Sequence, residues 1–558
     1  MSAINLLSHQ EKHVENIWNL LVKDQAFSFI DTSQTGNGKT ITTLYLAKEL
    51  QKKYGTKVMI VGPSDTSLNN DDGWLSNAKK YGISVKVATT YPALRGGRGK
   101  VSHPWLIPDP KDKKKWTASE KFEKLCSEGL FLIFDEFHHT KNASISHFAC
   151  AALVKMAKKY RKVCRVALLS HTPGEKKEVY PQILRMTGLI ASTKMFKYIP
   201  FVKEYRIENY GLGELKNLCL KLSPNSELDI EDMMRGMSKS KSQLVCKELY
   251  DTYIRSIITF AMPKPKNDFK ATLVNSFLET DEKSLLMVQQ GIDILSGAVN
   301  WNAANQQVGD ASQWSLENIG NGLKMVERGK LLSMARYINR GVEKNPNKKF
   351  VVSCGARGLE HHEILRKLIY RQSTPEDYHD IISELREKND EWRRLPKDMI
   401  NYITGFICGK VGPKVLNGSV KKKDRVKIIK EFQEDSNKTW CLIISPGIGS
   451  ESISLHDKHG KRDREMLIIP DYFFSRTIQS SGRVNRTGMK SAAKVMIVYS
   501  KEASLETSIL NSMIRKTRVA RDLIAEGQDV TFPGEFPFQI EGKKDEDLEY
   551  RLSMIRGY

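Results

Sequence analysis

The amino-acid sequence predicts an α/β fold in which parallel sheets are covered on both faces by helices. Residues 130–134 form a short, fully apolar run, which is typical of a strand buried on both faces of a parallel sheet. Across residues 1 to about 190, similar strand-like runs alternate with helical segments, as in consecutive βαβ units. Further apolar runs at 350–354 and 495–499 predict strands of a second region of the same kind.

A glycine-bearing turn near the amino end predicts a phosphate-binding loop. Residues 33–40 read Ser-Gln-Thr-Gly-Asn-Gly-Lys-Thr and lie between an apolar run and a helix-forming stretch. Gly36 and Gly38 allow the backbone N–H groups of such a turn to approach phosphate oxygens closely. We expect Lys39 to reach the β- and γ-phosphates and the Thr40 hydroxyl to bind Mg²⁺. Ser33 stands where the strict phosphate-loop pattern has glycine.

Two adjacent carboxylates supply the second half of the predicted site. Asp135 and Glu136 follow the apolar run 130–134 directly. The carboxyl ends of parallel strands face the crevice in which ligands of α/β proteins bind. We therefore expect Asp135 to hold the Mg²⁺ bound by Thr40, usually through water, and Glu136 to orient and deprotonate the attacking water. The alternative, that two acids only cap a strand before a loop, is disfavoured by the phosphate loop upstream.

The sequence Asp-Glu-Phe-His at 135–138 resembles motif II of the DEAD/DEAH-like superfamily 2 helicases and translocases. Other segments resemble further motifs of that superfamily in the expected order. They are the glutamine leader at 6–10, motif Ia at 58–63, motif Ib at 89–95, motif III at 168–173, motif V at 442–449 and 452–455, and motif VI at 479–486. The resemblance implies two RecA-like lobes with parallel sheets, a helical insertion between the lobes, and ATP bound in the cleft.

The same resemblance implies roles for individual residues. Arg483 and Arg486 would reach the γ-phosphate from the second lobe, although each could instead form a surface ion pair. Ser170 and Thr172 of motif III would couple the nucleotide site to the nucleic-acid site. The nucleotide would be bound by Gln10, which reads adenine, and by Thr35, Gly36, Asn37, Gly38, Lys39, Thr40, Gln479 and Gly482. Nucleic-acid phosphates would be bound by Pro63, Ser64, Thr90, Arg95, Ser353, Ser445 and Gly447.

The branch within the superfamily is indicated less sharply. The residues after motif II, His139 to Asn142, and the Arg-x-x-Arg-Thr-Gly ending of motif VI lean toward Swi/Snf-like DNA translocases, so we expect DNA more than RNA as partner. His171 stands where remodeller-type relatives usually have glycine. The insertions are reminiscent of helicases carried by large DNA viruses, phages or plasmids.

Composition constrains the class and the partners. The chain has 558 residues, a formal net charge of +23 and a pI near 9.4, which favours a polyanionic partner such as nucleic acid, although solubility alone is a second explanation. Lysines cluster at 111–115, 348–349 and 421–423. The 8 cysteines form no Cys-x-x-Cys pair, so a zinc site is not expected. Because the start lacks a signal pattern and no apolar run reaches the roughly 18 residues of a membrane span, we expect a soluble, intracellular protein in the cytoplasm, nucleus or virion.

We predict four regions along the chain. Residues 1–190 form the ATP-binding lobe and residues 346–515 form the second lobe. Residues 191–345 form a helical insertion or linker, and residues 516–558 form a helix and a charged tail that docks on a partner or folds back on the second lobe. The insertion and the tail are candidate sites for protein partners.

Three functions are weighed. The first is an ATP-dependent helicase or translocase, favoured by the intact Lys39, Asp135, Glu136, Arg483 and Arg486. The second is a motor-like docking subunit of a viral or plasmid transcription or replication assembly, which the insertion and tail keep open. The third is a phosphate-loop NTPase that acts on a protein or small molecule, such as a kinase. Motif VI and the net charge disfavour this third function.

Overall fold

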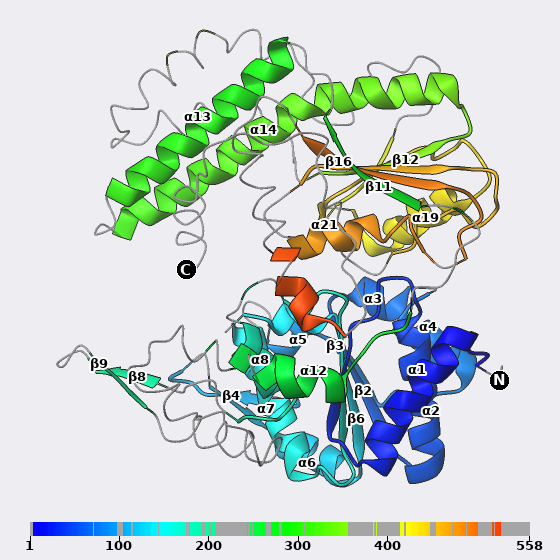
Figure 1. The fold of residues 1–558 in the computed structure, drawn as a ribbon, viewed down its shortest axis with the longest axis vertical. Helices are drawn as coiled ribbons and strands as arrows, with labels where there is room; N and C mark the ends of the chain where they lie inside the picture. The colour runs from blue at the N-terminus through cyan, green and yellow to red at the C-terminus, as the bar shows by residue number, and fades with distance from the viewer. Residues whose placement is uncertain are drawn as a thin grey trace. The chain divides into compact units, whose positions relative to one another are not determined.

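The computed structural model describes residues 4–525 with gaps, the longest of which are 97–103, 208–242, 355–382, 388–412, 447–452 and 500–515; residues 526–558 lie outside it. The chain divides into two compact units (Figure 1). Unit 1 comprises Met1–Lys266 with Lys516–Val530, and unit 2 comprises Asn267–Arg515 with Thr531–Tyr558. Each unit is described by itself.

Unit 1 is built on a six-stranded sheet in which every pairing is parallel. The strand order is β10 (Thr259–Phe260), β1 (Ser28–Asp31), β7 (Arg165–Leu169), β6 (Leu130–Asp135), β2 (Lys57–Gly62) and β3 (Val87–Thr90). The non-sequential order places β7 between the strand that leads into the phosphate loop and the strand that ends in Asp135. The carboxyl ends of β1, β7 and β6, which are far apart in the sequence, therefore lie side by side at the same end of the sheet.

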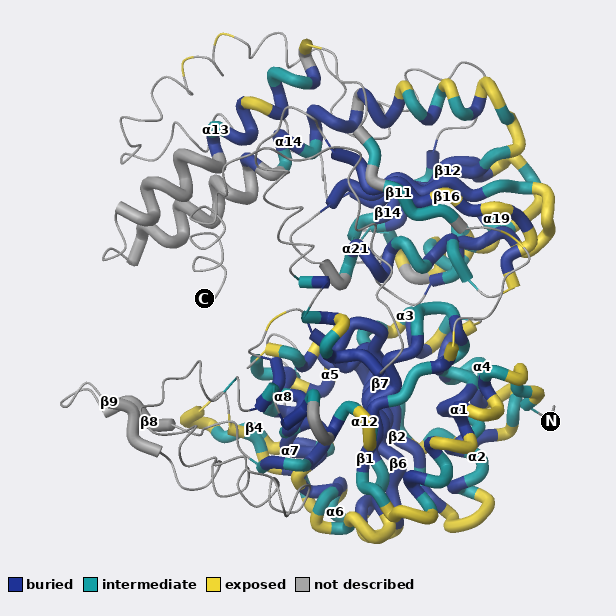
Figure 2. Tube along the Cα trace, in the orientation of Figure 1, coloured by how far each residue is buried: buried dark blue, intermediate teal, exposed yellow. Residues whose placement is uncertain are grey.

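Helices cover both faces of this sheet, and the strands are its buried centre (Figures 1 and 2). Phe131 and Ile133 of β6 pack toward one face, while Leu132 and Phe134 pack toward the other, because successive side chains of a strand alternate. The first face carries α1 (Ser8–Trp18), α2 (Lys39–Tyr54) and α4 (Trp74–Tyr81); the second carries α6 (Glu120–Ser127), α7 (Ile145–Lys159) and α8 (Val179–Met186).

Shorter elements complete unit 1. They are the π-helix Asn19–Lys23, α3 (Asp65–Asn69), α5 (Tyr91–Leu94), the 3-10 helix Phe137–Thr140, the π-helix Tyr250–Ile254, α12 (Arg255–Ile258), and the antiparallel pairs β4 (Leu106–Pro108) with β5 (Trp116–Ala118) and β8 (Phe196–Ile199) with β9 (Glu204–Ile207).

Unit 2 also has a six-stranded parallel sheet. Its order is β11 (Ala271–Phe277), β16 (Ala493–Tyr499), β15 (Arg464–Ile468), β12 (Lys349–Ser353), β14 (Cys441–Ile444) and β13 (Lys414–Leu416). In Figure 1, α14 (Gly309–Lys344) lies on one face, and α19 (Lys422–Gln433) and α21 (Phe474–Ser481) lie on the other. The predicted fold class, α/β with two parallel, helix-covered sheets, is confirmed.

The helix pair of unit 2 packs closely. The helix α13 (Glu282–Ala304) runs along α14, and Gly329 of α14 lies against α13. A Cβ atom at Gly329 would stand 2.6 Å from the carbonyl oxygen of Ser284, a separation that side chains do not tolerate. Glycine therefore sets the distance between the two helices.

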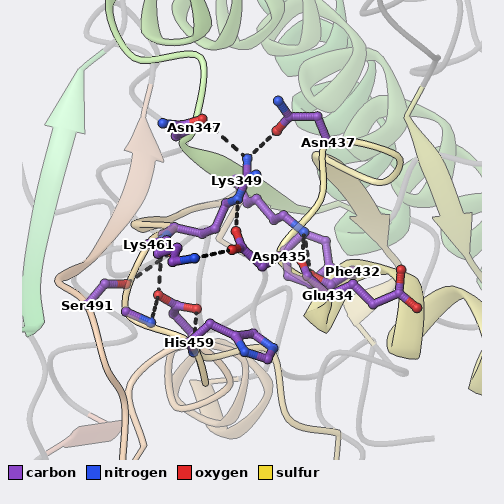
Figure 3. Close-up of polar contacts among 12 residues, drawn as sticks. Asn347, Lys349, Phe432, Glu434, Asp435, Asn437, His459, Lys461 and Ser491 are labelled. Carbon is purple, nitrogen blue, oxygen red and sulfur yellow. Dashed lines mark hydrogen bonds and ion pairs between the residues drawn. The ribbon is translucent and has the colours of Figure 1, made fainter.

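Two of the clustered lysines are engaged inside unit 2, and Figure 3 shows the contacts of one of them, Lys349. Lys349 Nζ donates hydrogen bonds to the carbonyl oxygens of Phe432, at 2.8 Å, and Glu434, at 2.7 Å. Burial, and to a smaller extent the positive charges of Arg464 and Arg462, lowers the pKa of Lys349 to about 7. Lys348 Nζ pairs with the Glu465 carboxylate at 2.8 Å. This pair of lysines thus ties strands to loops and is not an open phosphate-binding surface.

The compact units do not end at the predicted boundaries. The region 191–345, predicted to be helical, includes β8, β9, β10 and β11 besides its helices; β10 extends the sheet of unit 1 and β11 pairs with β16 of unit 2. The residues of β11, Ala-Thr-Leu-Val-Asn-Ser-Phe, include the β-branched and aromatic types that are enriched in strands. Among the described residues, no helix is both long and apolar enough to span a bilayer.

The segment that follows the second sheet returns to unit 1. Leu523 joins the apolar cluster under α7 and α8, and its carbonyl accepts a hydrogen bond of 2.8 Å from the Tyr250 hydroxyl. Arg255 Nε donates to the Ile524 carbonyl at 2.6 Å. This part of the predicted 516–558 region therefore docks on the first unit and not on the second, because its apolar residues complete the core of unit 1.

Candidate nucleotide site

The predicted phosphate loop joins the carboxyl end of β1 to the amino end of α2. Gly36 and Gly38 adopt left-handed backbone angles, with φ of 94° and 96°. A Cβ at Gly38 would also lie 2.4 Å from Gln10 Nε2. Gln10 Nε2 donates to the Asn37 carbonyl at 3.0 Å, and Gln10 Oε1 accepts from the backbone N–H of Leu7 at 3.0 Å. Gln10, predicted to read adenine, is thus attached to the phosphate loop itself.

Polar groups of the loop converge at its inner side. Lys39 is buried, and its Nζ donates to the carbonyl oxygens of Ser33 at 2.6 Å and of Gln34 at 3.5 Å. Among the described residues, the buried Thr35 Oγ1 and Asn37 Nδ2 atoms have no hydrogen-bond partner. A cation together with unpaired hydroxyl and amide groups in a glycine turn suits a phosphate group.

A buried polar network that the sequence did not reveal supports the base of the loop. Asp31 accepts hydrogen bonds from the backbone N–H, at 2.9 Å, and the hydroxyl of Ser33, and its other oxygen lies 3.1 Å from His13 Nε2. Burial alone would raise the pKa of Asp31, but His13, Lys39 and the Ser33 hydroxyl hold it below its ordinary value. The one available signal was that His13 follows Gln10 by three residues on the same helix face.

The loop base also anchors the two segments that enter and leave unit 2. Ser33 Oγ accepts a hydrogen bond of 2.8 Å from the backbone N–H of Met262, which follows β10. Thr32 Oγ1 donates to the Phe260 carbonyl at 3.1 Å and accepts from the backbone N–H of Ala525 at 3.0 Å. The serine that replaces the expected glycine therefore ties the phosphate loop to a distant part of the chain.

Asp135 and Glu136 end β6 at the same sheet edge as the phosphate loop. Asp135 Oδ2 accepts a 2.9 Å hydrogen bond from Trp74 Nε1, and the Tyr91 hydroxyl donates to the Asp135 carbonyl at 2.9 Å. Burial, and to a smaller extent the negative charge of Glu136, raises the pKa of Asp135 to about 7. Mg²⁺ is commonly held by one carboxylate together with substrate phosphates, so Asp135 and Thr40 fit the predicted Mg²⁺ donor set.

Glu136 is held in a strained conformation by motif III. Its φ and ψ angles of 51° and 52° are left-handed, which is uncommon for a residue with a side chain and is concentrated at functional sites. Ser170 Oγ donates to Glu136 Oε2 at 3.4 Å, and His138 Nδ1 lies 3.0 Å from Ser170 Oγ and 3.2 Å from Glu136 Oε2. Ser170 Oγ also accepts from the N–H of Thr172 at 3.3 Å. The structure thus brings motifs II and III together.

The predicted nucleic-acid residues of unit 1 lie at the ends of two neighbouring strands. Pro63 and Ser64 follow β2, Thr90 ends β3, and Gly62 pairs with Thr90 in the register. The hydroxyls of Ser64 and Thr90 accept hydrogen bonds from backbone N–H groups of the short helices that follow them. Arg95 is exposed after α5.

The corresponding residues of unit 2 are also adjacent. Ser353 ends β12 opposite Ile444, and Ser445 follows β14, with its N–H donating to the Leu416 carbonyl at 3.1 Å. Gly447 lies outside the described residues. Their contact with phosphates remains a prediction.

Motif VI forms the end of α21 and the turn after it. Gln479 and Arg483 are buried, and Gly482 follows the helix. Arg486 Nη2 donates to the Ile453 carbonyl at 2.8 Å, and the Leu455 N–H donates to the Arg483 carbonyl at 2.9 Å. Motif VI is thus joined to motif V within unit 2. That the two arginines reach a γ-phosphate stays a prediction.

The parallel sheets, the phosphate loop, the Asp-Glu pair and the ordered motifs are those of the superfamily 2 helicases, a class of enzymes that use ATP and act on nucleic acid. Residues 3–189 match the family described as the type III restriction enzyme, res subunit. This match covers the phosphate loop and motifs II and III.

The chain is also similar to individual proteins. The chain is 23% identical over 533 residues, 92% of this chain and 83% of the relative, to a protein of Acanthamoeba polyphaga mimivirus named "Putative ATP-dependent RNA helicase". It is 25% identical over 132 residues, 23% of this chain and 7% of the relative, to the TATA-binding protein-associated factor MOT1 of Saccharomyces cerevisiae. The match to the crystal structure of the Pyrococcus furiosus Hef helicase domain covers 90% of this chain and 97% of that chain, at 13% identity and a TM-score of 0.36.

Proposed function

We propose that this enzyme hydrolyses ATP to translocate along a nucleic-acid backbone, with DNA as its track. The observation that carries the proposal is the meeting, at one sheet edge, of the phosphate loop, the Asp135–Glu136 pair and the motif III hydrogen bonds. Such an arrangement serves phosphoryl transfer and has a built-in connection between two motifs. Phosphate contacts from both units would give binding with little sequence preference.

In the proposed mechanism, Lys39 and the loop N–H groups orient the β- and γ-phosphates. Thr40 and Asp135 would hold Mg²⁺, which would supply positive charge to the phosphates. Glu136 takes a proton from the attacking water as the bond to the leaving ADP breaks. Ser170 and Thr172 of motif III couple the state of Glu136 to the nucleic-acid site. Arg483 and Arg486 of unit 2 stabilise the γ-phosphate charge, so that movement of the units depends on the nucleotide.

Different observations support DNA and RNA as the polymer along which the enzyme translocates. The residues after motif II and at the end of motif VI resemble Swi/Snf-like DNA translocases, and one relative is a TATA-binding protein-associated factor. The relative that matches most of the chain is named an RNA helicase, which makes RNA the second candidate track. A motor-like docking subunit, in which hydrolysis is secondary, is the alternative function.

The deciding experiment measures ATP hydrolysis by the parent and by Glu136→Gln with single-stranded DNA, duplex DNA, single-stranded RNA and duplex RNA. We expect stimulation by DNA that Glu136→Gln abolishes. Stimulation by RNA alone would replace the track, and turnover that ignores every polymer would favour the docking subunit.

Nucleic-acid binding has its own test. Lys39→Ala should lose most ATP turnover and keep its affinity for nucleic acid at low salt. In both proteins the affinity should fall by about a thousandfold between 50 and 200 mM salt, because phosphate contacts release counterions. Equal turnover in parent and variant would contradict the site, and a flat salt response would point to a protein partner.

A further inference from the structure

One residue at the centre of the candidate site has no role in the mechanism above. His171 follows Ser170 at the carboxyl end of β7, the strand that lies between β1 and β6 in the sheet. The Ser170 N–H donates to the Asp31 carbonyl at 3.0 Å, and the Ser170 hydroxyl donates to Glu136. The residue before His171 is thereby bonded both to the strand that leads into the phosphate loop and to Glu136. His171 itself stands where the resemblance to remodeller-type proteins leads one to expect glycine.

The imidazole is buried with unsatisfied polar atoms. His171 is 6% exposed, and among the described residues neither Nδ1 nor Nε2 has a hydrogen-bond partner. The next hydroxyl, Thr172 Oγ1, is also buried without a partner in the described part of the chain. Burying such groups unpaired is unfavourable, and in native proteins they are usually hydrogen-bonded. A pair of unsatisfied ring nitrogens at a ligand site therefore points to a ligand.

The surrounding charges identify the kind of ligand. Burial, followed by the positive charge of Lys39, lowers the pKa of His171 to about 3, and the negative charge of Glu136 acts in the opposite direction. The ring is therefore neutral at physiological pH, with one donor and one acceptor nitrogen. It stands near the cation expected to bind the γ-phosphate and the carboxylate expected to bind the water.

We propose that His171 is a catalytic residue that contacts the γ-phosphate of ATP through a ring N–H. The inference rests on the proposed function. In the reaction the water oxygen bonds to the γ-phosphorus, the bond to the bridging oxygen breaks, its electrons leave with ADP, and the water proton passes to Glu136. His171 transfers no proton; its donor stabilises charge on a γ-phosphate oxygen, and its acceptor nitrogen is available to the attacking water.

The assignment separates γ-phosphate recognition from binding of the rest of the nucleotide. We would measure the affinities of the full chain for ADP and for the non-hydrolysable β,γ-imido analogue of ATP, together with kcat and KM. His171→Leu fills the space without polar atoms, whereas His171→Asn retains a donor and an acceptor. His147→Leu is the matched control, because His147 is also buried and the pKa of its ring is also lowered to about 3.

We expect His171→Leu to bind ADP within twofold of the parent and the imido analogue about 10- to 100-fold more weakly, with kcat lowered by about 100-fold. His171→Asn should recover part of both losses, and His147→Leu should change neither. Unchanged analogue affinity and kcat in His171→Leu would overturn the proposal. Equal weakening of ADP and analogue, with no rescue by His171→Asn, would also overturn it, since that is the result of a packing role.

The outcome is distinguishable from failure of the proposed function. If the parent hydrolyses no ATP with any polymer, the motor function fails, but the comparison of ADP with the imido analogue still decides whether His171 contacts the γ-phosphate. If hydrolysis is normal and His171→Leu behaves as the parent, only the His171 assignment fails.

Discussion

The Ser33→Ala substitution tests whether the serine at the first position of the phosphate loop is an anchor. The Ser33 side chain is fully buried and accepts the Met262 N–H at 2.8 Å, while its own hydroxyl donates to Asp31. Alanine would leave a buried backbone N–H unsatisfied and remove a hydrogen bond to a charged group. The sum of the two losses is about 2–4 kcal/mol of unfolding free energy for unit 1, a large share of the stability of an ordinary domain.

The loss should be local as well as global. We would follow hydrogen exchange of peptides that cover residues 259–262 and compare chemical unfolding of the variant with that of the parent. At 1.4 kcal/mol for each factor of ten, exchange of the Met262 amide should accelerate by about 30- to 1000-fold. Ser127→Ala is the control, because that serine is exposed and makes one local hydrogen bond. If Ser33→Ala and Ser127→Ala exchange and unfold alike, the anchoring role is refuted.

Three further predictions concern other features. Gly38→Ala should weaken ATP binding at least about tenfold, since its Cβ would overlap Gln10 Nε2. Gly55→Ala, at a glycine that also has a positive φ but has open space around it, should leave nucleotide titrations unchanged. The pKa of His147 is lowered to about 3 in the folded chain, so that the unfolded chain protonates this histidine first as the pH falls. The unfolding free energy of unit 1 should therefore decrease by about 1.4 kcal/mol per pH unit between about pH 6.5 and 3. His147→Leu should flatten that part of the acid-unfolding curve. Gly329→Ala should destabilise unit 2 by about 1–3 kcal/mol in thermal unfolding, because the added methyl meets α13; an unchanged melting temperature would contradict the close packing.

Much of the fold was predictable because the relevant signals are local. A strand covered on both faces has no polar positions, and residues 130–134 therefore identified β6 directly. The phosphate loop was equally visible, since the requirement for glycine at left-handed positions and for a following Lys-Thr is fixed by short-range geometry. The Asp-Glu pair could be placed because it follows a strand whose end was already known.

The remainder depends on contacts that no local pattern records. The strand β10 has only two residues and exists because it pairs with β1. Its residue Phe260 accepts a hydrogen bond from Thr32, which lies 228 residues away in the sequence. The hydrogen bond from Ala525 to Thr32 spans 493 residues. The Trp74 side chain is buried, and its hydrogen bond to Asp135 depends on the three-dimensional order of the strands.

Unit 1 is assembled from two segments that are far apart in the chain, and this affects how the chain folds during synthesis. Its sheet and core need Thr259 and Phe260, and its Tyr250 and Thr32 hydroxyls also form hydrogen bonds with the backbone of Leu523 and Ala525. A ribosome that has released the first 190 residues has therefore exposed an unfinished unit, with an uncovered sheet edge and an open apolar surface. All of unit 2 up to Arg515 must emerge before the last pieces of unit 1 arrive. Such a nascent intermediate is a target for chaperones, and slowing translation late in the message would lengthen its life.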